Sequence, residues 1–190
     1  MKTRTDLLNH LTRRHGLTRY LEIGVQNPSQ NFDLIECEYR IGVDPDPNAN
    51  AAFCMTSDEF FESYPYKSSS VPFDLIFLDG LHTAEQVKKD FYNSLKILSP
   101  GGFIVMHDCN PEKEEHTIVP RPTERGHWNG DVYKFAIGFK LHITVDIDNG
   151  CTIIRKGNIF WERNDVTWEY FDANRKELLN LITWDEFVKL

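Results

Sequence analysis

Residues 73–91, FDLIFLDGLHTAEQVKKDF, restrict the fold of this chain more than any other stretch. Residues 73–78 form an almost continuous apolar run, which is typical of a strand that is covered on both faces of a sheet. Directly afterwards, apolar residues recur at spacings of three and four, which predicts a helix that begins with a capping box of Thr83 and Gln86. A buried strand that passes into a helix within a few residues indicates a parallel α/β sheet.

The same alternation of strands and helices continues along the chain. Strands are predicted at residues 19–25, 40–46, 73–78 and 103–108, with a weaker one near 51–55. Helices are predicted at residues 6–15, 28–38, 131–139 and in the tail from residue 174. The alternating segments LHITVDI and CTIIRK flank DNG, which predicts an antiparallel hairpin. We therefore expect a doubly wound, Rossmann-like sheet of seven mostly parallel strands with a C-terminal antiparallel hairpin.

The length of 190 residues favours one domain, spanning 1–190. Within it we expect an N-terminal helix at 1–16, a substrate-side loop at 109–130 and a helical C-terminal tail at 157–190. The net charge of -8 argues against nucleic acid and membrane partners. The sequence has neither a run of about 20 apolar residues nor an N-terminal signal-peptide core, so a cytoplasmic protein is expected. The four cysteines form no CxxC pair and are expected to be reduced.

Polar residues stand where four predicted strands end. The ends carry Glu22 and Gly24, then Asp44, then Asp79 with His82, then Asp108. Ligands of doubly wound sheets bind beyond the carboxyl ends of the strands. An acid roughly 20 residues beyond a strand-end glycine can accept hydrogen bonds from ribose hydroxyls, and Asp44 fits that spacing. The chain has no GxGxxG after its first strand, which favours S-adenosylmethionine over NAD as the nucleoside ligand.

Several segments together resemble a known enzyme family. The blocks are YLEIGV, IGVDPDP, MTSDEFF, FDLIFLDGLHTAEQVKKDF and LSPGGFIVMHDCNP, followed later by WNGDVYKF and NRKELLNLI. They are similar to consecutive blocks of class I S-adenosylmethionine-dependent methyltransferases, and most of all to a short bacterial methyltransferase-domain family with an FIDGLH…HDCNP signature. The chain departs from the usual pattern in its first loop, where Gln26 and Asn27 stand in place of the second glycine.

The resemblance implies a role for each residue at the cofactor side. Glu22, Gly24 and the departing Gln26 would shape the loop under the amino-acid end of S-adenosylmethionine. Asp44 would hold the ribose, although an aspartate before proline can also be a simple turn former. The resemblance places the adenine contacts at Ser57 and Asp58, and Asp58 has the alternative role of a helix cap.

The resemblance also implies a catalytic group. Asp79 and Asp108 correspond to magnesium ligands, and His82 to the base, of metal-dependent O-methyltransferases that act on catechols or macrolide sugars. Two carboxylates suit magnesium, and a histidine can take a proton from an acceptor hydroxyl. The alternatives are that both acids contact the cofactor or shape loops without a metal, and that His82 only caps a helix. His107 is interpreted as a satisfied strand-end histidine.

The expected function is O-methylation of a small hydroxylated molecule, a sugar or a polyol, with S-adenosylmethionine as cofactor and Mg²⁺ as an additional candidate. The loop at 109–130 offers four side chains that can close over such an acceptor: Arg121, Arg125, His127 and Trp128. Two alternatives stay open, a non-catalytic module that binds S-adenosylmethionine or another nucleoside, and a nucleotide-sugar or NAD-dependent enzyme. The oligomeric state is also open, with a homodimer as one option.

Overall fold

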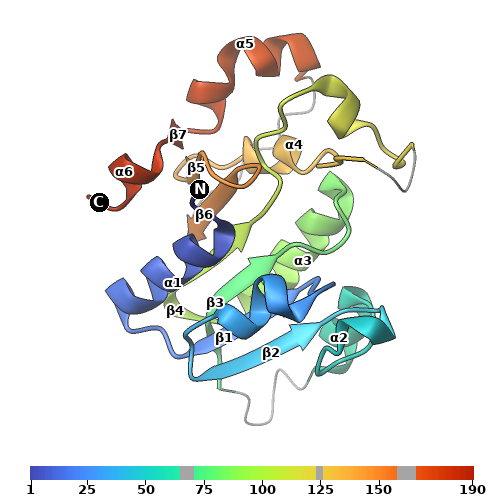
Figure 1. The fold of residues 1–190 in the computed structure, drawn as a ribbon, viewed down its shortest axis with the longest axis vertical. Coiled ribbons are helices and arrows are strands. Elements are labelled where there is room, and N and C mark those ends of the chain that lie inside the picture. Colours follow the sequence, from blue (N-terminus) through green and yellow to red (C-terminus); the bar gives the residue numbers. More distant parts are fainter. Residues whose placement is uncertain (65–70, 123–125, 158–165) are drawn as a thin grey trace.

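The computed structural model describes residues 1–64, 71–122, 126–157 and 166–190, and it contains one seven-stranded sheet. The strands are β1 (Arg19–Ile23), β2 (Tyr39–Val43), β3 (Phe73–Leu78), β4 (Leu98–Met106), β5 (Ile143–Val145), β6 (Cys151–Arg155) and β7 (Leu181–Ile182). Their order in the sheet is β2-β1-β3-β4-β6-β5-β7 (Figure 1). Among the strand pairs in the described residues, only β4–β6 and β5–β6 are antiparallel. The predicted mostly parallel sheet with a late hairpin is therefore confirmed.

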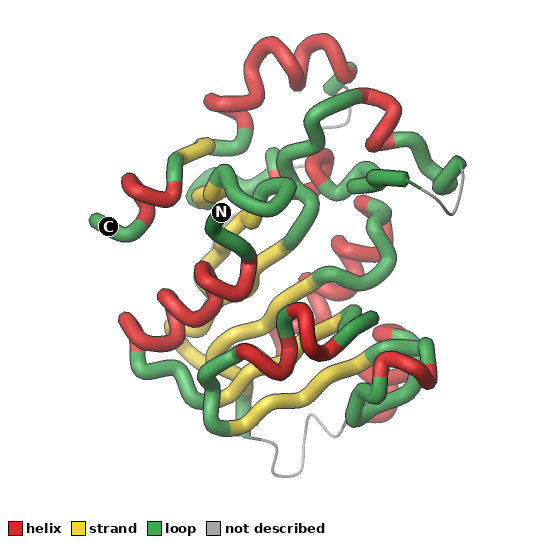
Figure 2. The backbone as a smooth tube through the Cα atoms, in the orientation of Figure 1, coloured by secondary structure: helices red, strands yellow, loops and turns green. Residues whose placement is uncertain are grey.

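Helices cover both faces of this sheet, as the red and yellow segments of Figure 2 show. The α-helices are α1 (Arg4–His15), α2 (Ser57–Ser63), α3 (Ala84–Ile97), α4 (Tyr133–Ala136), α5 (Trp168–Leu178) and α6 (Trp184–Phe187). Short 3-10 helices occupy Pro28–Gln30, Phe32–Leu34, Pro47–Ala49 and Glu114–Thr117. None of the helices in the described residues combines the length and the apolar character that a membrane span requires.

Strand β3 contributes side chains to two hydrophobic cores, one on each face of the sheet. Leu75 and Phe77 pack in the core that also contains the leucines of α1 and Phe187 of α6. Ile76 and Leu78 point to the other face, where the apolar residues of α2, α3, α4 and α5 cover them. This alternation explains why the sequence of β3 is apolar throughout, since successive side chains of a strand point to opposite faces.

The predicted helix at 28–38 is wrong, because two short 3-10 helices replace it. Asn31 between them leaves helical geometry, with φ of -147°, and donates its side-chain amide to Tyr20 and Glu22. The predicted strand near 51–55 is also wrong, because it shrinks to a single bridge between Val43 and Phe53.

The seventh strand comes instead from the tail. Residues 181–182 form β7 beside β5, where the backbone N–H of Asp146 donates to the carbonyl of Ile182 at 2.8 Å. The tail is therefore not helical throughout, because α5 and α6 flank a strand that satisfies the edge of β5. The predicted helix at 131–139 is reduced to Tyr133–Ala136. Residues 158–165 lie outside the described part of the tail.

Candidate active site

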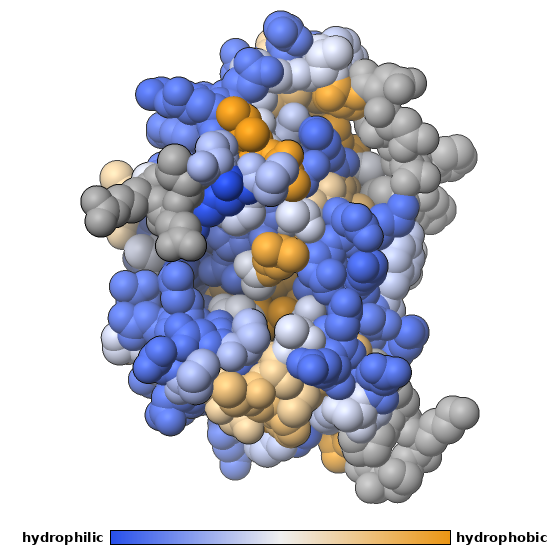
Figure 3. Space-filling view, turned by 90° about the vertical axis from the view of Figure 1, so that its right-hand side faces the viewer, coloured by the Kyte–Doolittle hydropathy of each residue, from blue (hydrophilic) through white to orange (hydrophobic). Residues whose placement is uncertain are grey.

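A cavity of about 780 Å³ lies at the carboxyl ends of β1, β2, β3 and β4. Figure 3 shows that this face of the molecule is hollowed near its centre, with hydrophilic residues to both sides of the hollow and hydrophobic residues at its centre and below it. All nine site residues that the sequence singles out line this one cavity: Glu22, Gly24, Gln26, Asp44, Ser57, Asp58, Asp79, His82 and Asp108. The parallel strands bring them together because their carboxyl ends meet at the same edge of the sheet.

Gly24 joins the ends of β1 and β3. Its φ of +88° is favourable for glycine, and a Cβ atom added there would lie 2.1 Å from the carbonyl oxygen of Asp79. The next residues form a tight loop in which Gln26 also has a positive φ, of 49°. The glycine therefore allows the loop after β1 to lie directly against the start of the Asp79 segment.

Asp44 holds this loop in place. Its Oδ2 accepts hydrogen bonds from the backbone N–H groups of Val25 at 2.9 Å and Gln26 at 2.8 Å, while its Oδ1 accepts from Asp46 at 2.8 Å. A carboxylate has roughly four acceptor positions, so three are used by the backbone. The turn-forming role that the sequence allowed for Asp44 is thus present in the structure, and Asp44, which lines the cavity, keeps about one further acceptor position.

Glu22 is buried, with only 2% of its surface exposed. Its Oε2 accepts from the hydroxyl of Tyr20 at 2.6 Å and from the side-chain amide of Asn31 at 3.0 Å. Burial raises the pKa of Glu22 to about 7, and the nearby negative charge of Asp79 acts in the same direction.

Gln86 of α3 connects α3 to α2 at the rim of the cavity. Its side-chain amide nitrogen lies 3.2 Å from Ser57 Oγ, 2.9 Å from Asp58 Oδ1 and 3.1 Å from Asp90 Oδ1. The predicted capping box is therefore half formed: the hydroxyl of Thr83 caps α3, but the Gln86 side chain turns to α2 instead. Burial raises the pKa of Asp90 to about 6.

Asp58 is not the cap of α2. Thr56 caps that helix, and Thr56 and Glu59 complete a reciprocal capping box around its first turn. Ser57 and Asp58 therefore occupy the first turn beside the cavity without serving as the cap.

His82 lies between the two predicted acids. Its Nδ1 is 2.9 Å from Oδ2 of Asp108, and its Nε2 is 3.5 Å from Oδ1 of Asp79. Its ring stacks on Trp128, with the planes 9° apart and the centroids separated by 5.3 Å. Burial acts to lower the pKa of His82, but the hydrogen bond to Asp108 and the two negative charges outweigh burial and raise it.

His107 belongs to the same cluster, which the sequence interpretation missed. Only 4% of its surface is exposed, and its Nδ1 lies 3.0 Å from Oδ1 of Asp79 and 3.4 Å from Oδ2 of Asp108. Burial opposes its protonation, but the two carboxylates raise the pKa of His107 well above its usual value. The available signal was its position beside Asp108 at the end of an apolar strand.

Asp108 itself has an unusual backbone, with φ of 58°. Its Oδ1 accepts from the side-chain amide of the fully buried Asn129 at 2.7 Å. Burial acts to raise the pKa of Asp108, but the adjacent His107 and His82 hold it well below its ordinary value. The charged form of this carboxylate is therefore strongly favoured.

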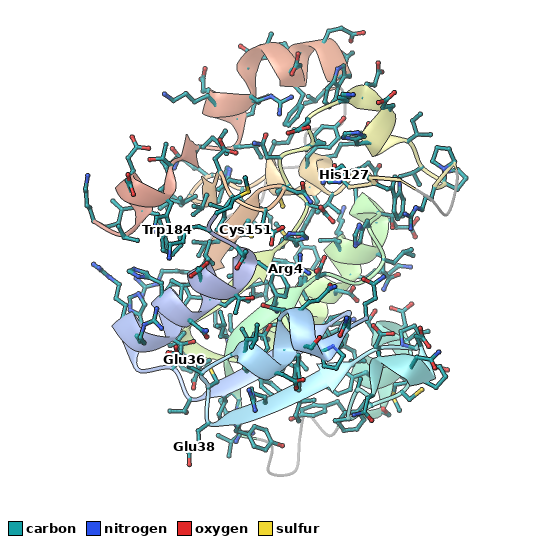
Figure 4. All side chains as sticks on the ribbon, in the orientation of Figure 1. Arg4, Glu36, Glu38, His127, Cys151 and Trp184 are labelled. Carbon is teal, nitrogen blue, oxygen red and sulfur yellow. The ribbon has the colours of Figure 1, made fainter. Side chains whose placement is uncertain are left out.

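Arg4 is a second residue that the sequence interpretation missed. It begins α1 and lines the cavity, and Figure 4 labels it near the middle of the molecule. Its Nε lies 3.8 Å from Oδ2 of Asp79, and its guanidinium lies 3.4 Å from Oδ2 of Asp148 in the turn between β5 and β6. No local pattern marks Arg4, because the contacts depend on how α1 packs against the sheet.

Asp79, His82 and Asp108 fit the donor set of a divalent cation, because one ligand atom from each lies within 4.8 Å of the others. The two carboxylates are suited to magnesium, whereas imidazole is a less typical magnesium ligand. The same carboxylates also contact His107 and Arg4, so a cation at this place would share them with positively charged groups.

The loop after β4 covers one side of the cavity. Arg121, His127 and Trp128 line it, whereas Arg125 lies outside the described residues. The indole N–H of Trp128 donates to the carbonyl of Ile118 at 2.8 Å, and the guanidinium of Arg121 lies 5.4 Å from a Trp128 ring centroid. These contacts hold Trp128 against His82.

Residues 11–109 match the methyltransferase-domain family, and this match spans just over half of the chain. The chain belongs to this family. The methyltransferase assignment covers β1 to β4 and the strand ends that carry the cavity residues from Glu22 to Asp108. By family, the protein is an enzyme of the S-adenosylmethionine-dependent methyltransferases.

Solved structures share this fold at low sequence identity. A candidate caffeoyl-CoA O-methyltransferase from Staphylococcus aureus is 19% identical with a TM-score of 0.55, covering 83% of this methyltransferase and 85% of that chain. An O-methyltransferase from Bacillus cereus in complex with SAH is 15% identical with a TM-score of 0.51, covering 79% of each chain. No curated protein matches the sequence of this methyltransferase.

Proposed function

We propose that this methyltransferase transfers a methyl group from S-adenosylmethionine to a hydroxyl oxygen of a small acceptor, such as a sugar or a polyol. The observation that carries the proposal is the position of His82 on the cavity wall, between Asp79 and Asp108. A histidine held by carboxylates next to a cofactor-sized cavity is suited to removing a hydroxyl proton.

The cofactor contacts follow the order of the strands in this proposal. Ser57 and Asp58 at the start of α2 contact the adenine, and Asp44 at the end of β2 accepts hydrogen bonds from the ribose. Glu22, Gly24 and Gln26 at the end of β1 surround the amino-acid group. When bound, S-adenosylmethionine supplies a methyl group on a sulfonium, so the protein's task is to position and deprotonate the acceptor.

His82 acts as the base through Nε2. Its Nδ1 faces Oδ2 of Asp108 at 2.9 Å, so the carboxylate fixes the ring and favours the tautomer with a proton on Nδ1. In the neutral ring, Nε2 then has its lone pair available for the proton of an acceptor hydroxyl. The stacked ring of Trp128 limits rotation of the imidazole and contributes an apolar wall to the acceptor side.

Mg²⁺ is part of the proposal as an optional partner of Asp79 and Asp108. A bound magnesium ion would make an acceptor hydroxyl more acidic. Support comes from the spacing of the donor atoms. The names of two proteins with the same fold, both O-methyltransferases, agree with oxygen as the acceptor atom but show only the fold at this level of identity.

The domain organisation is proposed on the same grounds. Residues 1–16 provide α1 and its Arg4, residues 109–130 are assigned to the acceptor-side loop, and residues 157–190 are assigned to the C-terminal tail, whose described part carries α5, β7 and α6. The described portions of these segments occupy positions that agree with these roles.

The test combines binding and turnover. We expect S-adenosylmethionine to bind in calorimetry, and release of S-adenosylhomocysteine with members of a panel of sugars, polyols and catechols. His82→Ala should keep cofactor affinity and lose roughly 10²–10⁴-fold in turnover. Asp44→Ala should lose roughly 10–100-fold in cofactor affinity.

Each alternative has its own outcome. Cofactor binding without turnover on any acceptor would favour a non-catalytic binding module. Binding of NAD or a nucleotide sugar in preference to S-adenosylmethionine would contradict the proposal. Turnover by His82→Ala at the wild-type rate would contradict the assignment of His82 as the base. Unchanged activity in the presence of a chelator would contradict a role for magnesium.

A further inference from the structure

Arg4 is a cation on the cavity wall whose own hydrogen bonds are poor. Among the described residues, no atom accepts a hydrogen bond from its buried Nε. Its guanidinium NH1 contacts Asp148 at 3.4 Å and lies 3.5 Å from Nε2 of His107, both long for a charge-assisted hydrogen bond. Because Nε is shielded from solvent, the donors of Arg4 that can reach a ligand in the cavity are those of its terminal NH1 and NH2 groups, for which only these two long contacts are found among the described residues.

Arg4 lies at the same end of the cavity as Glu22. The neighbouring Thr5 donates its hydroxyl to Oδ1 of Asn31 at 2.8 Å, and Asn31 in turn donates to Glu22 at 3.0 Å. This chain of contacts ties the start of α1 to the end of β1. The Arg4 guanidinium and the Glu22 carboxyl both line the cavity near the start of the loop after β1, and each influences the pKa of the other.

The loop itself has few groups left for an anion. The backbone N–H groups of Val25 and Gln26 are both occupied by Oδ2 of Asp44, at 2.9 and 2.8 Å. The second glycine, which would allow a ligand to approach the loop closely, is replaced by Gln26 and Asn27. A carboxylate bound beside this loop therefore needs a side-chain partner.

We propose that Arg4 binds the α-carboxylate of S-adenosylmethionine, with Glu22 beside it facing the α-ammonium group. This inference rests on the proposed function, in which S-adenosylmethionine is the cofactor. An α-amino acid is a zwitterion: the Arg4 guanidinium matches the charge of its carboxylate, and the carboxyl oxygens of Glu22 can accept hydrogen bonds from its ammonium group. The planar guanidinium can hold a carboxylate through two parallel hydrogen bonds.

The other arginine among the described cavity residues serves a different place. Arg121 lies over the ring of Trp128 and donates to the carbonyl of Gly126 at 3.1 Å, on the acceptor-side loop. Arg4 instead comes from α1 and contacts Asp79 and the Asp148 turn. In this assignment Arg4 is the cation that binds the cofactor, and Arg121 is a different cation on the acceptor side.

The experiment compares two ligands that differ in one group. Decarboxylated S-adenosylmethionine keeps the adenosine, sulfonium and amine of the cofactor and lacks only its carboxylate. Calorimetry on the full chain should show that Arg4→Gln weakens S-adenosylmethionine binding roughly 10–100-fold, while affinity for the decarboxylated compound stays within about twofold. Arg4→Lys keeps the positive charge but cannot form two parallel hydrogen bonds to a carboxylate. Its affinity for S-adenosylmethionine should therefore lie between those of wild type and Arg4→Gln.

Arg13→Gln is the matched control. Arg13 lies on the same helix, and it pairs at 2.6 Å with Glu36, which Figure 4 labels at the lower left edge, away from Arg4. The substitution changes the net charge by the same amount as Arg4→Gln, so a general effect of charge on a cationic ligand would appear in both variants. We expect Arg13→Gln to bind both ligands as wild type does.

Four results would overturn the assignment. Equal loss of affinity for both ligands in Arg4→Gln would make Arg4 a structural partner of Asp148 only, and no loss at all would exclude contact with the cofactor. If Arg4→Gln does not fold, equal binding of the two ligands by wild type contradicts the proposal. Failure of wild type to bind either ligand would instead refute the proposed function and this inference with it.

Discussion

Glu22 on β1 and Asp108 after β4 are buried acids on either side of the end of β3, and their pKa values move in opposite directions. Glu22 accepts from the neutral donors Tyr20 and Asn31, so burial dominates and raises its pKa to about 7. Asp108 faces two histidines whose charges hold its pKa well below the ordinary value. One cavity thus combines a carboxyl that is easily protonated with one that stays charged.

We expect Glu22→Gln to remove part of the pH dependence of stability. The folded protein keeps a proton on Glu22 up to about pH 7, whereas an ordinary glutamate releases it near 4.5. Because the folded state binds more protons in this window, the free energy of unfolding falls as pH rises from 4.5 to 7. The loss is on the order of 2–3 kcal/mol.

Urea unfolding at pH 4.5 and pH 8 checks this expectation. Glutamine can still accept from Tyr20 and Asn31, so the variant should fold and should show a smaller fall in stability between the two pH values than wild type. Glu36→Gln is the control, because Glu36 is an exposed acid that pairs with Arg13. This variant should show the same fall in the free energy of unfolding between the two pH values as wild type. An unchanged pH dependence in Glu22→Gln would show that Glu22 is ionised throughout.

At the level of elements, the junction of β1 with β3 depends on Gly24. We expect Gly24→Ala to destabilise the fold by about 3 kcal/mol or more, because the new Cβ would lie 2.1 Å from a backbone oxygen and the residue has φ of +88°. Gly16→Ala, with φ of +63° and no atom within 4 Å of the added Cβ, should cost only about 1 kcal/mol. Chemical denaturation measures both, and equal costs would contradict the steric argument.

The sequence predicts the elements well where the pattern is local. The apolar run of β3 and the spacing in α3 identify a βα unit, and the DNG turn identifies the β5–β6 hairpin. The short β7 escapes prediction, because its strand geometry comes from pairing with the open edge of β5 rather than from two residues of sequence. Asn31 likewise breaks a helix for a tertiary reason, its bonds to Tyr20 and Glu22.

For the candidate site too, features that depend on local sequence can be predicted, and features that depend on tertiary contacts cannot. Residues directly at strand ends, such as Asp79 and Asp108, can be found from sequence because parallel strands gather their carboxyl ends. Arg4 cannot, since only the packing of α1 carries it to the cavity. His107 is adjacent to Asp108 in sequence, yet which histidine faces the acids depends on the backbone at the end of β4, where Asp108 has a positive φ.

At the scale of the whole molecule, the cavity is present without a ligand. Its walls include the ends of four strands, α1, α2 and the loop after β4. A ligand that binds only the folded state should therefore stabilise the entire domain. We expect S-adenosylhomocysteine at 100 times its Kd to raise the free energy of unfolding by about 2.7 kcal/mol. Thermal unfolding with increasing ligand measures this shift.

Asp44→Ala at the same ligand concentration is the control for that measurement. It should show a smaller increase in Tm than wild type, because the lower affinity reduces the ratio of ligand concentration to Kd. An increase in Tm that does not depend on ligand concentration would contradict binding to the folded state.

The contact between Arg4 and Asp148 joins residues separated by 144 positions. A ribosome adds roughly 5–20 residues per second, so about 7–30 s pass between the synthesis of these two side chains. Glu22, Asp79 and Asp108 are all synthesised within that interval, while Arg4 still lacks its anionic partner in the hairpin. The charge network of the cavity is therefore completed late in synthesis, after the four parallel strands have left the peptidyl-transferase centre.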